Sequence, residues 1–343
     1  MLIGAHESVA GGLERAFGLA AEDGCEAIQV FTKNANQWRE PALTSEQCEA
    51  FRKARKSSSL AAAPILSHDS YLINLCTADQ DLKIRSRESL LAEALRCEAL
   101  GIEYVVLHPG AHMGAGVDAG VEAAAEILTW VLDQTRGAQV ALLIENTAGQ
   151  GSSIGSRFEE VAAIVAGVEK AAGSAGKARI GVCLDTCHAF AAGYDLSNEH
   201  GFDLAWKQFD DVIGLERLKA MHLNDSKKGL GCRVDRHERI GLGELGTYAF
   251  WRLVNDPALA HVVGVLETPP VEKDRAYKPQ LLQLAGLRGA PAPAVRPAST
   301  AAPTATSSAK PAPKAAGRSS GKAAGKSAQN LVATSRPKPR AGR

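Results

Sequence analysis

One repeated pattern constrains the fold of this chain more than any other feature. A short run of apolar residues ends in a potential metal ligand, and a loop of small or polar residues follows. Six runs end in this way, at His68, His108, Glu145, Asp185, His222 and Glu267. One ligand-type residue at a strand end is common, but six call for a shared explanation. We interpret the runs as strands that deliver side chains to a single polynuclear metal site.

The spacing of these runs predicts the architecture. Strand-like runs also end near His6 and Phe31, so there are eight endings, separated by 25 to 45 residues. Apolar residues at helical spacing lie between them, for example at Leu90–Leu95 and Val121–Leu132. Eight strand–helix units in residues 1–287 predict a (β/α)₈ TIM barrel, an α/β fold. A doubly wound sheet of eight strands is the alternative.

The alternation of side chains along a strand predicts which way the ligands point. Asp185 shares a strand face with Cys183, while Leu184 lies on the opposite face. Glu145 shares a face with Leu143 in the same way. In a barrel the active site lies at the carboxyl ends of the strands. We therefore expect these acidic side chains to point into the barrel mouth, with Cys183 in the interior below them.

Composition limits the class of protein. The chain has 343 residues and is 45% hydrophobic, which suits either one large barrel or two average domains. It has no apolar run of 18 residues and no recognisable signal peptide, so we expect a cytoplasmic protein without membrane contact. The seven cysteines are odd in number and scattered, which indicates reduced thiols.

The net charge of +1 combines two unlike segments. Residues 288–343 hold eleven Lys and Arg and no acid, so residues 1–287 carry a net charge of −10. Metal ions bound at the strand ends would offset part of this negative charge inside the cleft. The second segment is rich in Ala, Pro, Ser, Gly and Lys, and this composition predicts a disordered tail. It is either a solubilising extension or a basic arm that holds the protein near DNA in a salt-dependent manner.

The candidate metal ligands combine imidazole and carboxylate groups without thiolate, as in catalytic zinc sites. Asp235 and His237 are spaced to lie on one side of an extended loop. Taken singly, each candidate has the ordinary alternative of capping a helix or holding a loop. The full set is His68, His108, Glu145, Asp185, His188, His222, Asp235, His237 and Glu267.

The chain also resembles the endonuclease IV family of apurinic/apyrimidinic endonucleases. The resemblance covers residues 1–287. It rests on long motifs in a fixed order, which are Gly4-Ala5-His6, Phe31-Thr32-Lys33-Asn34, Ser67-His68-Asp69-Ser70-Tyr71, His108-Pro109-Gly110, Glu145-Asn146-Thr147, Cys183-Leu184-Asp185-Thr186-Cys187-His188, His222-Leu223-Asn224-Asp225 and Asp235-Arg236-His237.

This resemblance implies a barrel with three zinc ions per chain, held by three groups of residues. The implied groups are His68, His108 and Glu145; Glu145, Asp185, His222 and Glu267; and His188, Asp235 and His237. Glu145 bridges two groups, and we expect it to be essential for catalysis. The implied reaction is hydrolysis of the phosphodiester 5′ to an abasic site in damaged double-stranded DNA, leaving a 3′-hydroxyl and a 5′-deoxyribose phosphate. We expect the enzyme to act as a monomer.

The same resemblance implies DNA contacts. Tyr71 corresponds to a family residue that wedges into the duplex, and we expect further contacts from Lys33, Asn36 and Gln37. Family members often have an arginine where Asn36 stands, so this departure bears on wedge strength and on the range of damage processed. A nucleotide without a base leaves the helix at lower cost than a paired one, which favours the lesion.

Two other functions compete with this interpretation. A metal-dependent sugar isomerase or epimerase uses the same kind of barrel. Such an enzyme binds one or two metal ions with fewer ligands, so it would not explain the presence of His188, Asp235 and His237. A non-catalytic DNA-binding protein gives no reason to gather nine ionisable groups. Gly241–Gly246 matches G-x-G-x-x-G, but no apolar strand precedes it. We interpret His112, His200 and His261 as ordinary surface or loop residues, and His6 as a support for the ligands.

Overall fold

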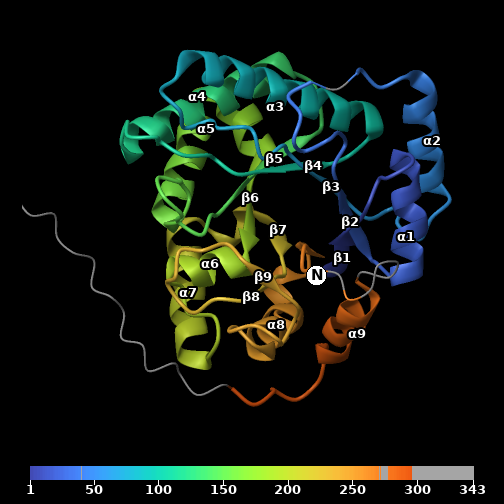
Figure 1. Cartoon of the computed structure of the whole chain (residues 1–343), viewed down its shortest axis with the longest axis vertical. Coiled ribbons are helices and arrows are strands. Elements are labelled where there is room, and N and C mark those ends of the chain that lie inside the picture. The colour runs from blue at the N-terminus through green and yellow to red at the C-terminus, as the bar shows by residue number, and fades with distance from the viewer. Residues whose placement is uncertain (40, 270, 272–276, 296–343) are drawn as a thin grey trace, which may run out of the picture. The chain divides into compact units, whose positions relative to one another are not determined.

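The structure, a computed structural model, describes residues 1–39, 41–269, 271 and 277–295. Eight parallel strands form a closed barrel in the order β1-β10-β7-β6-β5-β4-β3-β2 (Figure 1). The TIM-barrel prediction is therefore confirmed, and the doubly wound alternative is wrong. The strands are β1 (Leu2–His6), β2 (Ala27–Val30), β3 (Ile65–His68), β4 (Tyr104–Leu107), β5 (Ala141–Glu145), β6 (Ile180–Asp185), β7 (Leu218–His222) and β10 (Val263–Leu266).

Helices surround the barrel on its outer side (Figure 1). They are α1 (Ala16–Asp23), α2 (Ser45–Lys56), α3 (Gln80–Leu100), α4 (Val117–Gln134), α5 (Phe158–Arg179), α6 (Thr186–Ala192), α7 (Glu199–Val212), α8 (Thr247–Asn255) and α9 (Lys278–Leu287). The two helices expected from apolar spacing are α3 and α4. Local signals define α3: the Asp79 side chain accepts the N–H of Leu82 at its start, and Gly101 ends it in the left-handed conformation.

Two strands were not expected from the sequence. The short strands β8 (Asp225–Ser226) and β9 (His237–Glu238) form an antiparallel pair in the connection between β7 and α8. Three single turns of 3₁₀ helix, at Leu13–Arg15, Leu215–Arg217 and Pro257–Leu259, complete the regular structure. The β8–β9 pair matters for function because it fixes the backbone of His237.

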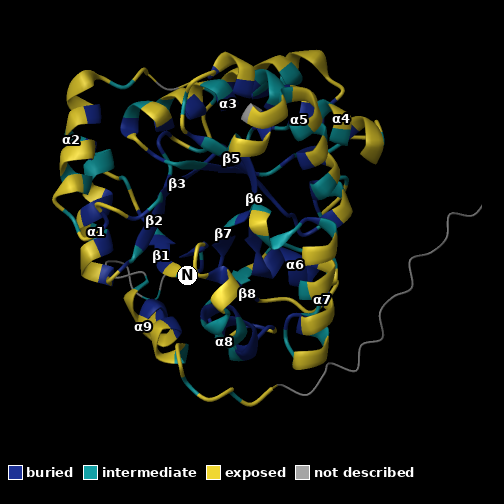
Figure 2. Ribbon diagram, turned by 180° about the vertical axis from the view of Figure 1, so that it is seen from behind, coloured by how far each residue is buried: buried dark blue, intermediate teal, exposed yellow. Residues whose placement is uncertain are grey.

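The core has two layers, one between strands and helices and one inside the barrel. The inner layer contains Ala27, Leu66, Val106, Leu143, Cys183, Ala220, Val263 and Val265. Val182 and Leu184 belong to the outer layer, so the predicted alternation along β6 is confirmed. Figure 2 shows the strands almost entirely buried, with exposed residues on the surrounding helices. Glu145 and Asp185 follow Leu143 and Cys183 by two residues, and therefore point into the mouth of the barrel.

The described chain continues beyond α9 and contacts the barrel. Arg288 donates to the Glu26 carboxylate at 2.8 Å, and Trp251 Nε1 donates to the carbonyl of Ala290 at 2.8 Å. Residues 296–343 lie outside the described residues, so the disordered tail stays a prediction. No described helix is both long and apolar enough to cross a membrane. All seven cysteines are free, as expected.

Candidate metal centre

The nine predicted ligands converge at the carboxyl-terminal mouth of the barrel. Six lie at the last residue of a strand or at the residue after it, His188 lies in the first turn of α6, and Asp235 and His237 lie just before and in β9. Side-chain atoms come within 4.8 Å of one another in groups that include His68, His108 and Glu145, and Glu145, Asp185, His222 and Glu267. These two groups match the first two sets that the resemblance implied.

The first group is organised around one carboxylate oxygen of Glu145. His68 Nε2 lies 3.2 Å from Glu145 Oε2, and His108 Nε2 lies 2.9 Å from the same oxygen. His68 Nδ1 lies 2.8 Å from the carbonyl oxygen of Asp69, which can only accept a hydrogen bond. The proton of neutral His68 therefore sits on Nδ1, and the Nε2 lone pair faces the group.

The second group uses the other oxygen of Glu145. His222 Nδ1 lies 2.8 Å from Glu145 Oε1 and 3.2 Å from Glu267 Oε2. Asp185 Oδ2 lies 3.8 Å from the same nitrogen. Glu145, with a fully buried side chain, thus presents Oε2 to one group and Oε1 to the next. This is the arrangement of a carboxylate that bridges two metal ions.

The third group lies beside the second and meets at Asp235. Asp235 Oδ2 lies 3.2 Å from His188 Nε2, and Oδ1 lies 3.2 Å from His237 Nε2. Two overlapping sets of donor atoms lie within 4.8 Å here: Asp185, His188 and His237, and Cys187, Asp235 and His237. The inclusion of Cys187 was not expected. Its Sγ donates to the carbonyl of Arg236 at 3.6 Å, which engages its proton.

The ionisation of these groups indicates a site built for positive charge. Burial opposes ionisation of Glu145, but His222 and His108 lower its pKa well below the usual value. Burial alone would lower the pKa of His188, yet Asp185 and Asp235 raise it well above the usual value. The carboxylates therefore draw protons onto the imidazoles in the absence of another cation. Bound metal ions would provide this positive charge without protonation of the histidines.

The donor atoms fit zinc in two further respects. Nitrogen and carboxylate oxygen, with no thiolate required, are the ligands of catalytic zinc. His237 Nε2 is buried and makes no hydrogen bond of good geometry within the described part of the chain, although carboxylate oxygens of Asp235 and Asp185 lie 3.2 and 3.5 Å away and buried nitrogens normally have such a partner. A nitrogen that binds a metal ion has no need of such a partner.

Three buried amides support the ligands, and the sequence analysis missed them. Asn224 Nδ2 donates to Asp185 Oδ2 at 2.6 Å. The Asn146 side chain donates to the backbone carbonyl of Asp185 at 3.2 Å and accepts the Asp185 N–H at 2.7 Å, and its backbone carbonyl lies 2.9 Å from His188 Nδ1. Gln29 contacts both His222 and Glu267. A signal for Gln29 was present, because it is a polar residue on the inward face of the otherwise apolar strand β2. His6 Nδ1 lies 3.3 Å from Glu267 Oε1, in the supporting position expected for it.

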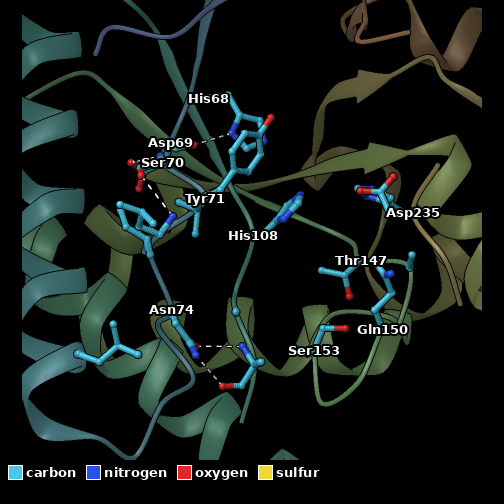
Figure 3. Close-up of a pocket in the computed structure, with 18 residues that line it drawn as sticks. His68, Asp69, Ser70, Tyr71, Asn74, His108, Thr147, Gln150, Ser153 and Asp235 are labelled. Atoms are coloured by element: carbon cyan, nitrogen blue, oxygen red, sulfur yellow. Dashed lines mark hydrogen bonds and ion pairs between the residues drawn. The ribbon is translucent and has the colours of Figure 1, made fainter. Parts of the chain in front are cut away.

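A pocket of about 390 Å³ opens beside the ligands. His68, His108, His188 and Asp235 line its polar end, and its walls include Leu72, Ile73, Leu82, Leu107, Ala111 and Ala148. Figure 3 shows Tyr71 and Asp235 on opposite sides, with His108 between them. The Tyr71 side chain is 60% exposed, and its ring lies 5.5 Å from that of His68. An exposed aromatic ring therefore stands directly next to the candidate ligands.

The other predicted DNA contacts differ in their placement. Asn36 and Gln37 are exposed in the loop after β2. Lys33 is only 8% exposed, and its Nζ donates to Ser89 Oγ on α3 at 2.7 Å. The structure thus places Lys33 inside the protein, because its side chain turns toward α3 and away from the pocket lined by Tyr71.

The patterns that were set aside have structural roles. Backbone N–H groups of Gly241, Gly243 and Leu245 donate to the Asp225 carboxylate at 2.9, 3.0 and 2.9 Å. The G-x-G-x-x-G segment therefore wraps around a side chain of the protein itself. His112 accepts the N–H groups of Gly114 and Gly116, as a loop residue does.

Fold and site together define a TIM-barrel protein whose carboxyl mouth carries adjoining clusters of imidazole and carboxylate groups that could hold metal ions. The family model described as xylose isomerase-like TIM barrel matches residues 17–284. The probable endonuclease 4 of Geotalea daltonii is 42% identical over 267 residues, which cover 78% of this chain and 91% of that protein. The probable endonuclease 4 of Halorhodospira halophila is 46% identical over 268 residues, covering 78% and 88%. The chain belongs to the endonuclease IV family, as its motifs indicated.

Solved structures agree with this assignment. The crystal structure of endonuclease IV from Thermus thermophilus is 37% identical, with a TM-score of 0.71, and the match covers 84% of this chain and 98% of that one. A D-tagatose 3-epimerase-like protein superimposes with a TM-score of 0.61 at 15% identity, over 84% of this chain and 98% of that one. The second likeness shows the fold alone.

Proposed function

We propose that this protein is a zinc-dependent endonuclease that hydrolyses the phosphodiester 5′ to an abasic site in double-stranded DNA. The products are a 3′-hydroxyl and a 5′-deoxyribose phosphate, as in the incision step of base excision repair. The observation that carries the proposal is the placement of Glu145, whose two oxygens face two groups of ligands beside an open pocket. Membership of the endonuclease IV family supports it.

The residues present would hold three zinc ions, in the three groups described above. When bound, zinc activates the attacking water and neutralises charge on the phosphate and the leaving oxygen. The residues of the chain orient these ions and need not supply a nucleophile. Glu145 links the first group to the second, and Asp185 lies within 4 Å of His188, His222 and His237, so it links the second group to the third.

The pocket selects the substrate by its shape and polarity. Its apolar walls suit a sugar without a base, and the Asn74 amide that lines it is engaged by the backbone of Ala111. Tyr71 stands exposed at the pocket mouth, where its ring can fill the space left by an extruded nucleotide. Extrusion costs less at a lesion that has neither stacking nor pairing, so the wedge favours abasic sites.

The segment that carries Asp235 is rich in basic residues. The connection from β8 to β9 carries four exposed basic residues, which are Lys227, Lys228, Arg233 and Arg236. Asp235 belongs to the same segment and lines the pocket. Phosphates of DNA bound at the pocket can therefore contact cations of this segment, although residues 1–287 are acidic as a whole.

The central test replaces the bridging carboxylate in the full chain. Glu145→Gln removes the charge that two ligand groups share, so we expect fewer than three zinc ions per chain and loss of incision by at least about 1,000-fold. Zinc is counted by elemental analysis, and incision is followed on a duplex with one tetrahydrofuran abasic analogue.

Glu7→Gln is the matched control, because Glu7 is a buried carboxylate at the end of β1 outside all ligand groups. It should retain three zinc ions and incision. Parent protein that binds only one zinc ion, or that leaves the duplex intact while it epimerises a ketose, would refute the nuclease proposal in favour of the sugar-enzyme alternative.

A further inference from the structure

β2 contributes no candidate metal ligand, but it places one polar side chain among them. Gln29 lies on the inward face of β2, two residues after Ala27 of the inner core layer, and it is fully buried. An uncharged amide at this position adds nothing to the charge of the metal centre. Its role must therefore lie in the hydrogen bonds that it makes.

Gln29 joins residues from three other strands. Its Oε1 lies 2.9 Å from His222 Nε2 on β7. Its Nε2 donates to Glu267 Oε1 after β10 at 2.6 Å, and lies 3.0 Å from His6 Nδ1 on β1. All the polar capacity of one buried amide is thus directed at two candidate ligands of the second group and at their neighbour His6.

The contact with Glu267 fixes the orientation of the amide. In the reverse orientation, Gln29 Oε1 would lie 2.6 Å from a carboxylate oxygen, and two acceptors at this distance repel each other. The oxygen of the amide therefore faces His222. Because an amide oxygen only accepts hydrogen bonds, His222 must carry its proton on Nε2.

This tautomer leaves the lone pair of His222 on Nδ1. That nitrogen is the atom that lies 2.8 Å from Glu145 Oε1 and 3.2 Å from Glu267 Oε2. Gln29 also orients Glu267. Its Nε2 donates a hydrogen bond to Glu267 Oε1, which leaves Glu267 Oε2 directed toward the second group. One side chain thus sets the donor atoms of two ligands.

We propose that Gln29 is a positioning residue that presents His222 Nδ1 and Glu267 Oε2 to the metal ion of the second group. The inference rests on the metal centre of the proposed function. Residues that hold metal ligands in this way contribute about 10- to 100-fold to metal affinity. Gln29 contacts two ligands of the second group, Glu267 and His222, and no ligand of the third group. We therefore expect its loss to weaken the binding of one zinc ion only.

The test uses Gln29→Met in the full chain, which keeps the length of the side chain and removes both hydrogen-bonding functions. We expect one of three zinc ions to bind about 10- to 100-fold more weakly, with the other two unchanged. Competition with a chromophoric chelator measures each affinity. Despite burial, nearby carboxylates raise the pKa of His222 in the metal-free protein, so its ring is examined at a pH high enough to neutralise it. There, the ¹⁵N chemical shifts of the variant should show a mixture of tautomers in place of a single Nε2–H form.

Gln280→Met is the matched control. Gln280 is also a buried glutamine, and it accepts hydrogen bonds from Ile240 N and from Thr268 Oγ1, next to Glu267 in the chain, but from no candidate ligand itself. It should lower thermal stability and leave all three zinc affinities unchanged. Gln29→Glu provides a second variant of nearly equal size: it keeps an acceptor for His222 but places a carboxylate against Glu267, so it should retain the tautomer and weaken the same zinc ion.

The outcomes separate this inference from the proposed function. Three unchanged zinc affinities in Gln29→Met, with a single His222 tautomer, would overturn the positioning role and leave the nuclease intact. Parent protein without zinc in the second group would instead overturn the metal centre itself. If Gln29→Met does not fold, the same comparison is made with Gln29→Glu, whose unchanged affinities would likewise reject the role.

Discussion

Glu7 shows how the barrel tolerates an acidic side chain outside the metal centre. It is buried at the end of β1, and Cys25 Sγ donates to its Oε1 at 3.4 Å. Burial, together with the nearby charge of Asp23, raises the pKa of Glu7 from 4.5 to about 7. Between pH 4.5 and about 7, the Glu7 carboxyl is therefore protonated in the folded protein and ionised in the unfolded chain. This contribution to stability is fully present below pH 4.5 and is lost as the pH rises through about 7.

Glu7→Gln should remove this dependence. We expect the free energy of unfolding of the variant, relative to the parent, to increase by up to about 3 kcal/mol between pH 5 and pH 8. Urea unfolding at several pH values, with zinc in excess, measures the difference. Glu49→Gln on α2 is the control for removal of one acidic side chain, because Glu49 is exposed. If the difference in unfolding free energy between Glu7→Gln and the parent is the same at every pH, Glu7 does not have a raised pKa.

The sequence reveals some residues of the metal centre and conceals others. Ligands such as Glu145 could be predicted, because an ionisable residue at the end of an apolar run is visible locally. The role of Gln29 could not, since it depends on His222, which lies 193 residues later. The burial of Lys33 was missed for the same reason, because Ser89 on α3 provides the hydrogen bond.

At the scale of elements, the segment after β9 is organised by one carboxylate. Asp225 of β8 accepts three backbone N–H groups from residues 241–245, and burial raises its pKa from 3.8 to about 6. A Cβ on Gly243 would lie 2.4 Å from Asp225 Oδ1, so the close approach needs glycine. The glycine pattern was visible in the sequence, but its partner 16 to 20 residues earlier was not. The eight strand ends, in contrast, were all predicted, because each strand carries its own apolar signal.

Asp225→Ala should release this segment. Three N–H groups lose their acceptor, and each unsatisfied group costs about 1–3 kcal/mol, so we expect a loss of roughly 3 kcal/mol or more in unfolding free energy. Hydrogen exchange should accelerate at residues 241–245. Asp225→Asn keeps one acceptor oxygen and should cost less. Equal stability of the alanine variant and the parent would show that the segment is held by other contacts.

At the scale of the whole chain, charge is distributed unevenly. Residues 296–343 contain ten Lys and Arg and no acid, whereas residues 1–287 carry a net charge of −10. The structure does not describe residues 296–343, so their role is argued from charge alone. Cations bound along DNA release counterions, and this makes affinity depend on salt. We therefore predict that this basic segment strengthens binding to undamaged DNA in a salt-dependent manner.

Removal of residues 296–343 tests this role. The truncation keeps Arg288, which bonds to Glu26, so the barrel should retain its stability and its three zinc ions. We plot the logarithm of the association constant for DNA against the logarithm of the salt concentration. The slope of this plot should decrease in magnitude by about 2 or more. Fluorescence anisotropy with undamaged duplex measures the slope, and incision at low salt is the control. An unchanged slope would assign the segment to solubility alone.

Closure of the barrel has a consequence for how the enzyme matures. β1 pairs directly with β10, and His6 at the end of the first barrel strand lies 3.3 Å from Glu267, which follows the last one. The second group of ligands is therefore incomplete until the last strand has left the ribosome. A nascent chain cannot capture its full complement of metal, so the capacity to cut DNA arises only after synthesis of the barrel is finished.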